Sequence, residues 1–112
     1  MKLFFDLIRR LNMAIDLKVS PNVCAYPDEN NEHMKIEIEL PGVKRESINI
    51  RMVENGFLIS AKGKDGVEFI STYSLCCPVK PDKAEAIYED GLLTITVPYK
   101  DLFEDAVKLE IK

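Results

Sequence analysis

The side chains best suited to chemistry in this chain are three cysteines. Cys24, Cys76 and Cys77 make an odd count, and an odd count without a secretory signal is typical of reduced thiols rather than a disulfide framework. Cys76 and Cys77 are neighbours at the end of a predicted strand, so we expect their side chains on opposite faces, which disfavours joint binding of a metal ion. The simpler expectation is that the thiols are buried or half-buried as small apolar groups.

The single histidine and the carboxylates do not form a catalytic pattern. His33 lies in the polar stretch DENNEH and is expected to be solvated. The sequence contains no G-x-S-x-G nucleophile motif, phosphate-binding glycine loop or H-E-x-x-H zinc motif. Most acidic residues alternate with apolar ones, as they do on the solvated face of a strand. We therefore predict that the protein is not an enzyme, binds no metal or cofactor and has no ATP site.

The composition of the whole chain is that of one globular domain, and its 112 residues suffice for a single hydrophobic core. The net charge of −4 argues against a nucleic-acid-binding protein, which normally carries a basic stripe. No apolar run approaches the ~20 residues that span a bilayer. Asp6, Arg9 and Arg10 interrupt any apolar core of a signal peptide, so we expect a cytoplasmic location.

The first part of the chain has the spacing of an amphipathic helix, and we expect residues 1–18 to form an N-terminal arm. This arm either offers its apolar stripe to other proteins, packs on its own domain, or lies on a membrane surface. The third possibility is the weakest, because the polar face carries both signs of charge. The stripe contains Leu3, Phe4, Leu7, Ile8, Leu11 and Ile15.

The next eighty residues show the two-residue period of strands, with turn signals at Pro41-Gly42, Asn55-Gly56 and Asp65-Gly66. About seven short strands with turns every eight to twelve residues are typical of a β-sandwich or a small barrel. We predict an all-β, mostly antiparallel sandwich over residues 19–99. Its strands are expected near 23–26, 34–40, 48–53, 57–62, 67–75, 85–88 and 92–97.

Residues 100–112 are predicted to be an extended tail. Val107, Leu109 and Ile111 lie on one side of it, with Lys108 and Glu110 between them. Apolar residues are not expected at a frayed terminus, so we expect this side to bind a groove. That groove lies either on a neighbouring subunit or on the chain's own domain, where the tail would pair as a final strand.

Four short motifs, in this order, resemble the small heat-shock protein family, whose core is the α-crystallin domain. They are IELPGV (38–43), ENGFLIS (54–60), the pattern of Ala86, Asp90, Gly91 and Leu93, and the tail motif of Leu109 and Ile111. The resemblance covers residues 20–112. It implies an immunoglobulin-like β-sandwich with a short amphipathic arm and an extended tail. It also implies a homo-oligomer that holds partly unfolded client proteins without ATP.

The resemblance further implies a groove between the strand at 48–53 and the short strand near 85–88. This groove would accept Leu109 and Ile111 from the tail of a neighbouring subunit, while the apolar stripe of the arm would bind clients and add contacts between subunits. The candidate groove residues are Ile48, Ile50, Met52, Ala86 and Tyr88.

Three features depart from the family. Ser71 stands where most members have an arginine, and Cys76 replaces the proline that usually ends that strand. The connection from Lys62 to Gly66 is too short for the long loop that carries a swapped strand in many members. Dimers would then form without a swapped strand, for example by edge pairing along 67–75. The main alternative is an adaptor of the same fold, similar to CS-domain co-chaperones, and a specialised structural protein of the superfamily is a further one.

Overall fold

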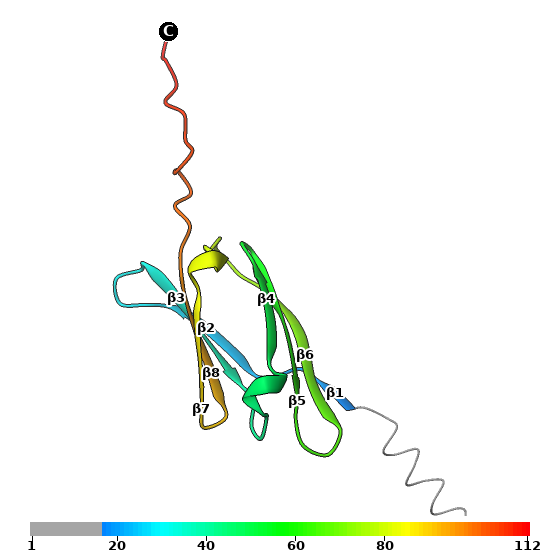
Figure 1. The fold of residues 1–112 in the computed structure, drawn as a ribbon. Helices are drawn as coiled ribbons and strands as arrows, with labels where there is room; N and C mark the ends of the chain where they lie inside the picture. The colour runs from blue at the N-terminus through cyan, green and yellow to red at the C-terminus, as the bar shows by residue number, and fades with distance from the viewer. Residues whose placement is uncertain (1–16) are drawn as a thin grey trace, which may run out of the picture.

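The computed structural model describes residues 17–112, whose eight strands form two four-stranded sheets packed face to face (Figure 1). One sheet has the strand order β1-β6-β5-β4, and the other has the order β2-β3-β8-β7. The predicted all-β sandwich is therefore confirmed, while the predicted N-terminal helix lies outside the described residues. The strands are β1 (Leu17–Val19), β2 (Val23–Pro27), β3 (His33–Glu39), β4 (Asn49–Val53), β5 (Gly56–Lys62), β6 (Val67–Ser74), β7 (Glu85–Glu89) and β8 (Leu92–Pro98).

The core lies between the sheets because alternate residues of the central strands point inward. Ile36 and Ile38 of β3 pair with Ile95 and Leu93 of β8, and all four side chains are at most 3% exposed. The residues between them in β3 are charged and face solvent, which explains the strict alternation of MKIEIEL. The fully buried large side chains are Ile36, Ile38, Leu40, Ile59, Val79, Ile95 and Val97.

The first strand differs from the prediction. Leu17–Val19 is not the end of a helical arm but the short strand β1, which pairs with Val67–Phe69 of β6. This pairing is parallel, whereas every other strand pair in the described residues is antiparallel. Three residues are too few to show a period, so the neighbouring β6 edge rather than local sequence decides their conformation.

Tight turns join the strands as the turn signals predicted. Asp65 and Gly66 both have positive φ between β5 and β6. At the β4–β5 turn, Gly56 is the first residue of β5 rather than a turn residue. A Cβ atom on Gly56 would lie 2.6 Å from the carbonyl oxygen of Tyr73 on β6. Only glycine therefore lets β5 and β6 approach this closely.

Candidate functional site

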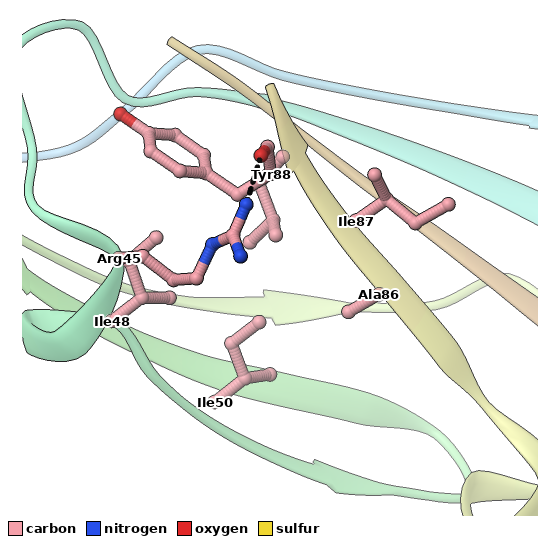
Figure 2. A pocket seen from close by; sticks show the side chains of 7 residues that line it. Arg45, Ile48, Ile50, Ala86, Ile87 and Tyr88 are labelled. Carbon is pink, nitrogen blue, oxygen red and sulfur yellow. Dashed lines mark hydrogen bonds between the residues drawn. The ribbon is translucent and has the colours of Figure 1, made fainter. Parts of the chain in front are cut away.

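An apolar groove lies between the edge strands of the two sheets. β4 is the last strand of one sheet and β7 is the last strand of the other, and a cavity of about 420 Å³ lies between them. Figure 2 shows Ile48 and Ile50 on the β4 side facing Ala86 on the β7 side. Edge strands leave backbone groups unpaired, so this groove combines apolar side chains with hydrogen-bonding capacity. Its lining residues are Arg45, Ile48, Ile50, Ala86, Ile87, Tyr88 and Leu93.

The backbone of β7 offers hydrogen bonds on the groove side. The carbonyl oxygen of Tyr88 accepts a hydrogen bond from Nη2 of Arg45 at 3.2 Å, so this carbonyl is directed away from β8. In an antiparallel pair the backbone groups of alternate residues point to the same side. The N–H and C=O groups of Ala86 and Tyr88 therefore face the open edge, where an added strand could use them.

The side chain of Tyr88 fixes one end of the groove. Its hydroxyl lies 2.7 Å from the carbonyl oxygen of Leu40 and 2.9 Å from that of Val43, to which it donates. These two carbonyls belong to the buried residues on either side of the exposed Pro41-Gly42 turn that follows β3. Tyr88 thus ties β7 to this turn and holds the position of the groove's β7 wall.

The hairpin between β7 and β8 explains the Ala86, Asp90, Gly91 and Leu93 pattern. Asp90 and Gly91 have φ of 50° and 78°, which gives the two-residue turn a backbone that glycine and aspartate adopt with little cost. The carbonyl of Gly91 accepts a hydrogen bond from the backbone of Leu40 at 2.7 Å. Leu93 is buried and lines the groove, so the pattern builds the β7–β8 hairpin and part of the groove floor.

The structure brings four of the five candidate groove residues together, namely Ile48, Ile50, Ala86 and Tyr88. The fifth, Met52, packs against the core and does not line the groove. Sequence reasoning missed Arg45 and Ile87 as groove residues, and it placed Leu93 only in the turn motif. Arg45 belongs to a charged stretch that is typical of a solvated loop, and Ile87 lies on the opposite side of the β7 ribbon from Ile48 and Ile50 (Figure 2).

The tail leaves the sandwich after residue 100 and extends away from it (Figure 1). Lys100 marks the last attachment, since its ammonium lies 2.9 Å from Oε1 of Glu54 and this hydrogen bond raises the pKa of Lys100. Beyond it the apolar side chains are bare, with Leu109 81% and Ile111 95% exposed. The tail forms no strand with its own domain in the structure. The arm residues Leu3 to Ile15 lie outside the described residues.

The β6 edge is only partly open. β1 pairs with the first three residues of β6, which leaves Ile70–Ser74 without a strand neighbour on that side in the described part of the chain. Ser71 pairs with Ile59 across the β5–β6 ladder. The connection between β5 and β6 spans residues 63–66 and contains no strand.

The cysteines contradict two expectations. All three are exposed rather than buried or half-buried. β6 ends at Ser74, so Cys76 and Cys77 follow the strand instead of alternating across it. A side-chain hydrogen bond with Cys76, followed by desolvation, raises the pKa of the Cys77 thiol. Residues 17–112 contain no cluster of three or more side chains suited to a metal ion.

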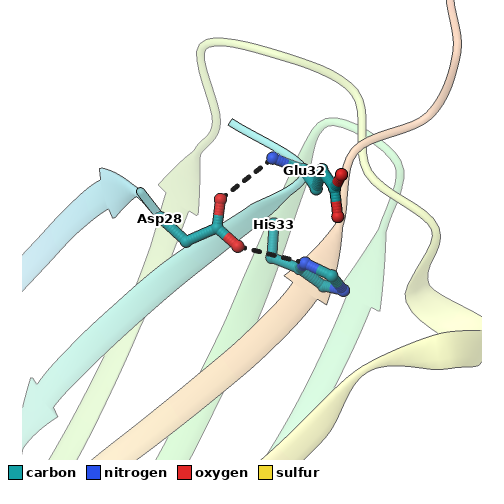
Figure 3. A network of polar contacts seen from close by, with 3 residues as sticks. All are labelled: Asp28, Glu32 and His33. Atoms are coloured by element: carbon teal, nitrogen blue, oxygen red, sulfur yellow. Dashed lines mark hydrogen bonds and ion pairs between the residues drawn. The ribbon is translucent and has the colours of Figure 1, made fainter. Parts of the chain in front are cut away.

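His33 is partly buried rather than fully solvated, and it contacts Asp28 in the turn between β2 and β3. Its Nδ1 atom lies 3.2 Å from Oδ2 of Asp28, and the other carboxylate oxygen of Asp28 accepts the N–H of Glu32 at 2.9 Å (Figure 3). Desolvation acts to raise the pKa of Asp28, but hydrogen bonds from the backbone of His33 and Glu32 and from the His33 ring outweigh it and lower this pKa. These contacts close the turn between β2 and β3.

Within the described range, no helix is long and apolar enough to cross a membrane.

Comparison with known proteins finds relatives over almost the whole chain. The Hsp20/alpha crystallin family matches residues 26–111. Heat shock protein 16 of Schizosaccharomyces pombe is 25% identical over 130 aligned positions, which cover 98% of this chain and 90% of that protein. Heat shock protein HSP.16.4 of Streptococcus thermophilus is 31% identical over 112 positions, which cover 85% of this chain and 77% of that protein.

Solved structures give the same result for the fold. Heat shock protein 16.0 from Schizosaccharomyces pombe has a TM-score of 0.67 at 25% identity and covers 99% of this chain and 90% of its own. The hspA protein from Xanthomonas axonopodis has a TM-score of 0.62 at 18% identity and covers 73% of this chain and 95% of its own, a likeness of fold alone.

Proposed function

Since this chain belongs to the Hsp20/alpha crystallin family, whose members are chaperones, we propose that it is an ATP-independent holdase that assembles reversibly through its C-terminal tail. It binds partly unfolded proteins and suppresses their aggregation without refolding them. The observation that supports this proposal most strongly is the pairing of features within one chain. An open apolar groove lies at one edge of the sandwich, and a tail with exposed Leu109 and Ile111 extends from it.

The proposed anchor works by strand addition. The tail supplies Leu109 and Ile111 two residues apart, which is the spacing of side chains on one face of a strand. The groove supplies apolar walls and the edge-facing backbone groups of β7, so hydrogen bonds and apolar contacts form together. The occupant we propose is the tail of a neighbouring subunit. From Pro98 to Leu109 the eleven-residue span reaches up to roughly 35–40 Å when extended, which is long enough to bridge two subunits.

The size of the anchor favours reversible assembly. Burying the two side chains contributes on the order of 3–6 kcal/mol. Ordering the tail and losing its freedom of motion offset much of this gain. A contact of this strength opens and closes readily, so heating can release subunits and expose the groove. The apolar stripe of the N-terminal arm (Leu3, Phe4, Leu7, Ile8, Leu11 and Ile15) is the surface that we propose for clients and further subunit contacts.

An aggregation assay tests the proposed function. A heat-labile enzyme is warmed with the intact protein, and its light scattering is followed with and without ATP. We expect roughly stoichiometric protein to suppress the scattering and ATP to make no difference. A Leu7→Ser/Ile8→Ser/Leu11→Ser variant should lose most of the protection while its sandwich stays folded by circular dichroism. Absence of protection by the intact protein, or full protection by this variant, contradicts the holdase function and favours an adaptor that binds one folded partner.

A further inference from the structure

The outer face of β7 carries two exposed glutamates beside the groove. Strand alternation puts Ala86 and Tyr88 on one face of β7 and Glu85, Ile87 and Glu89 on the other; of these three, only Ile87 also borders the groove. Both glutamates are exposed, and Ile87 is 59% exposed. Neither glutamate takes part in an ion pair among residues 17–112. This edge therefore presents two negative charges with an apolar residue between them.

The tail carries the complementary pattern. Its anchor residues alternate with Lys108, Glu110 and Lys112, so a tail strand with Leu109 and Ile111 in the groove turns these three outward. Among the outward residues of the tail, two lysines flank Glu110, just as two glutamates flank Ile87 on β7. We propose that Lys108 and Lys112 of one subunit pair with Glu85 and Glu89 of β7 in a neighbouring subunit, and that this charge pairing directs the tail to β7. The inference rests on the proposed anchoring of the tail.

The register on β7 gives the same pairs in either direction. In a parallel alignment that sets Leu109 beside Ala86, the outward residues 108, 110 and 112 lie opposite 85, 87 and 89. In an antiparallel alignment that sets Leu109 beside Tyr88, they lie opposite 89, 87 and 85. Each lysine faces a glutamate in both cases, and directly opposite charges on neighbouring strands attract.

The other wall of the groove offers less. The outward residues of β4 are Asn49, Arg51 and Val53, which give one positive charge and no negative one. An antiparallel tail that sets Leu109 beside Ile50 brings Lys108 opposite Arg51, which is repulsive. The parallel alignment offers one favourable pair, between Glu110 and Arg51. The tail can form two oppositely charged pairs with β7 and at most one with β4, so we assign it to β7. The Arg45 guanidinium donates a hydrogen bond to the Tyr88 carbonyl, and this bond has to break before the tail can pair with that carbonyl.

Charge reversal in the full-length chain tests this inference. Assembly is measured by sedimentation velocity over a dilution series for K108E/K112E, E85K/E89K and the variant with all four changes. Exposed pairs are weak singly, so we expect each double reversal to raise the concentration for half-assembly by about 3- to 10-fold at low salt. The fourfold reversal should return this concentration to that of the intact chain. In 1 M salt the difference between the double reversals and the intact chain should shrink. K35E/K64E, at two exposed lysines away from the groove, controls for net charge.

The anchor variant L109A/I111A separates the two proposals. If it loses assembly while both double reversals assemble like the intact chain, the charge pairing is overturned and the anchor stands. If the fourfold reversal fails to recover assembly, or K35E/K64E weakens it equally, the pairing is likewise overturned. If L109A/I111A itself assembles normally, the tail is not an anchor and both proposals fail.

Discussion

Replacing Tyr88 by phenylalanine should destabilise the sandwich through one hydroxyl group. The Tyr88 hydroxyl lies 2.7 and 2.9 Å from the carbonyl oxygens of Leu40 and Val43, both of which belong to residues buried in the core. Phenylalanine keeps the ring and removes only the donor. The Val43 carbonyl then loses its side-chain donor in a partly buried place, while the Leu40 carbonyl keeps the backbone N–H of Val43 at 3.4 Å.

The expected cost follows from this geometry. Leaving a buried acceptor without its donor costs about 1–2 kcal/mol. In a domain of this size each kcal/mol lowers the melting temperature by about 4–8 °C, so Tyr88→Phe should melt about 4–16 °C below the intact protein. Both proteins are melted at one protein concentration by circular dichroism, because assembly also shifts the melting temperature.

Tyr26→Phe is the matched control. Its hydroxyl donates to Oε1 of Glu37 at 2.7 Å on the exposed face of the β2–β3 pair, and this hydrogen bond raises the pKa of Tyr26. Removing an exposed hydrogen bond leaves both groups to water, so this variant should melt within about 2 °C of the intact protein. Equal losses for the two variants, or no loss for Tyr88→Phe, would refute the argument that the Tyr88 hydroxyl holds the turn after β3.

Two further predictions concern Gly56 at the start of β5 and Asp28 in the turn after β2. Gly56→Ala places a Cβ atom 2.6 Å from the carbonyl oxygen of Tyr73 on β6. We therefore expect the free energy of unfolding, measured in urea, to fall by about 1–3 kcal/mol. An unchanged midpoint would contradict the close approach of β5 and β6. The lowered pKa of Asp28 means that its carboxylate stabilises the fold above its ordinary pKa of about 3.9 and that this contribution disappears as the pH falls through the lower folded value. Asp28→Asn should therefore melt below the intact protein at pH 7, and the gap should narrow as the pH falls below about 3.9, whereas a difference that stays constant would show that the charge is not the cause.

Strand alternation made most of the sandwich predictable from sequence. In β3 the inward residues Ile36 and Ile38 alternate with charged ones, and the structure confirms this arrangement. The groove was expected from the family resemblance rather than from periodicity, and Ile48, Ile50 and Ala86 do line it. Local periodicity records which face a residue takes, and this was enough for the regular part of the fold.

The errors arose where long-range contacts decide the structure. β1 has only three residues, and its conformation depends on the first residues of β6, far along the chain. Cys76 and Cys77 were expected on a strand, but β6 ends before them and both are exposed. Arg45 reaches the Tyr88 carbonyl forty-three residues away, a contact that no sequence pattern indicates.

The most direct test of the claim that the tail joins subunits is the mass in solution. It is measured for the intact chain and for the Leu109→Ala/Ile111→Ala variant. Light scattering coupled to size exclusion measures both, and Leu102→Ala/Phe103→Ala serves as control because it removes exposed apolar side chains from the same tail outside the anchor. We expect the intact chain and the control to run as large oligomers and the anchor variant to collapse to dimers. If all three proteins have the mass of the same monomer or dimer, the tail does not join subunits and the proposed assembly is wrong.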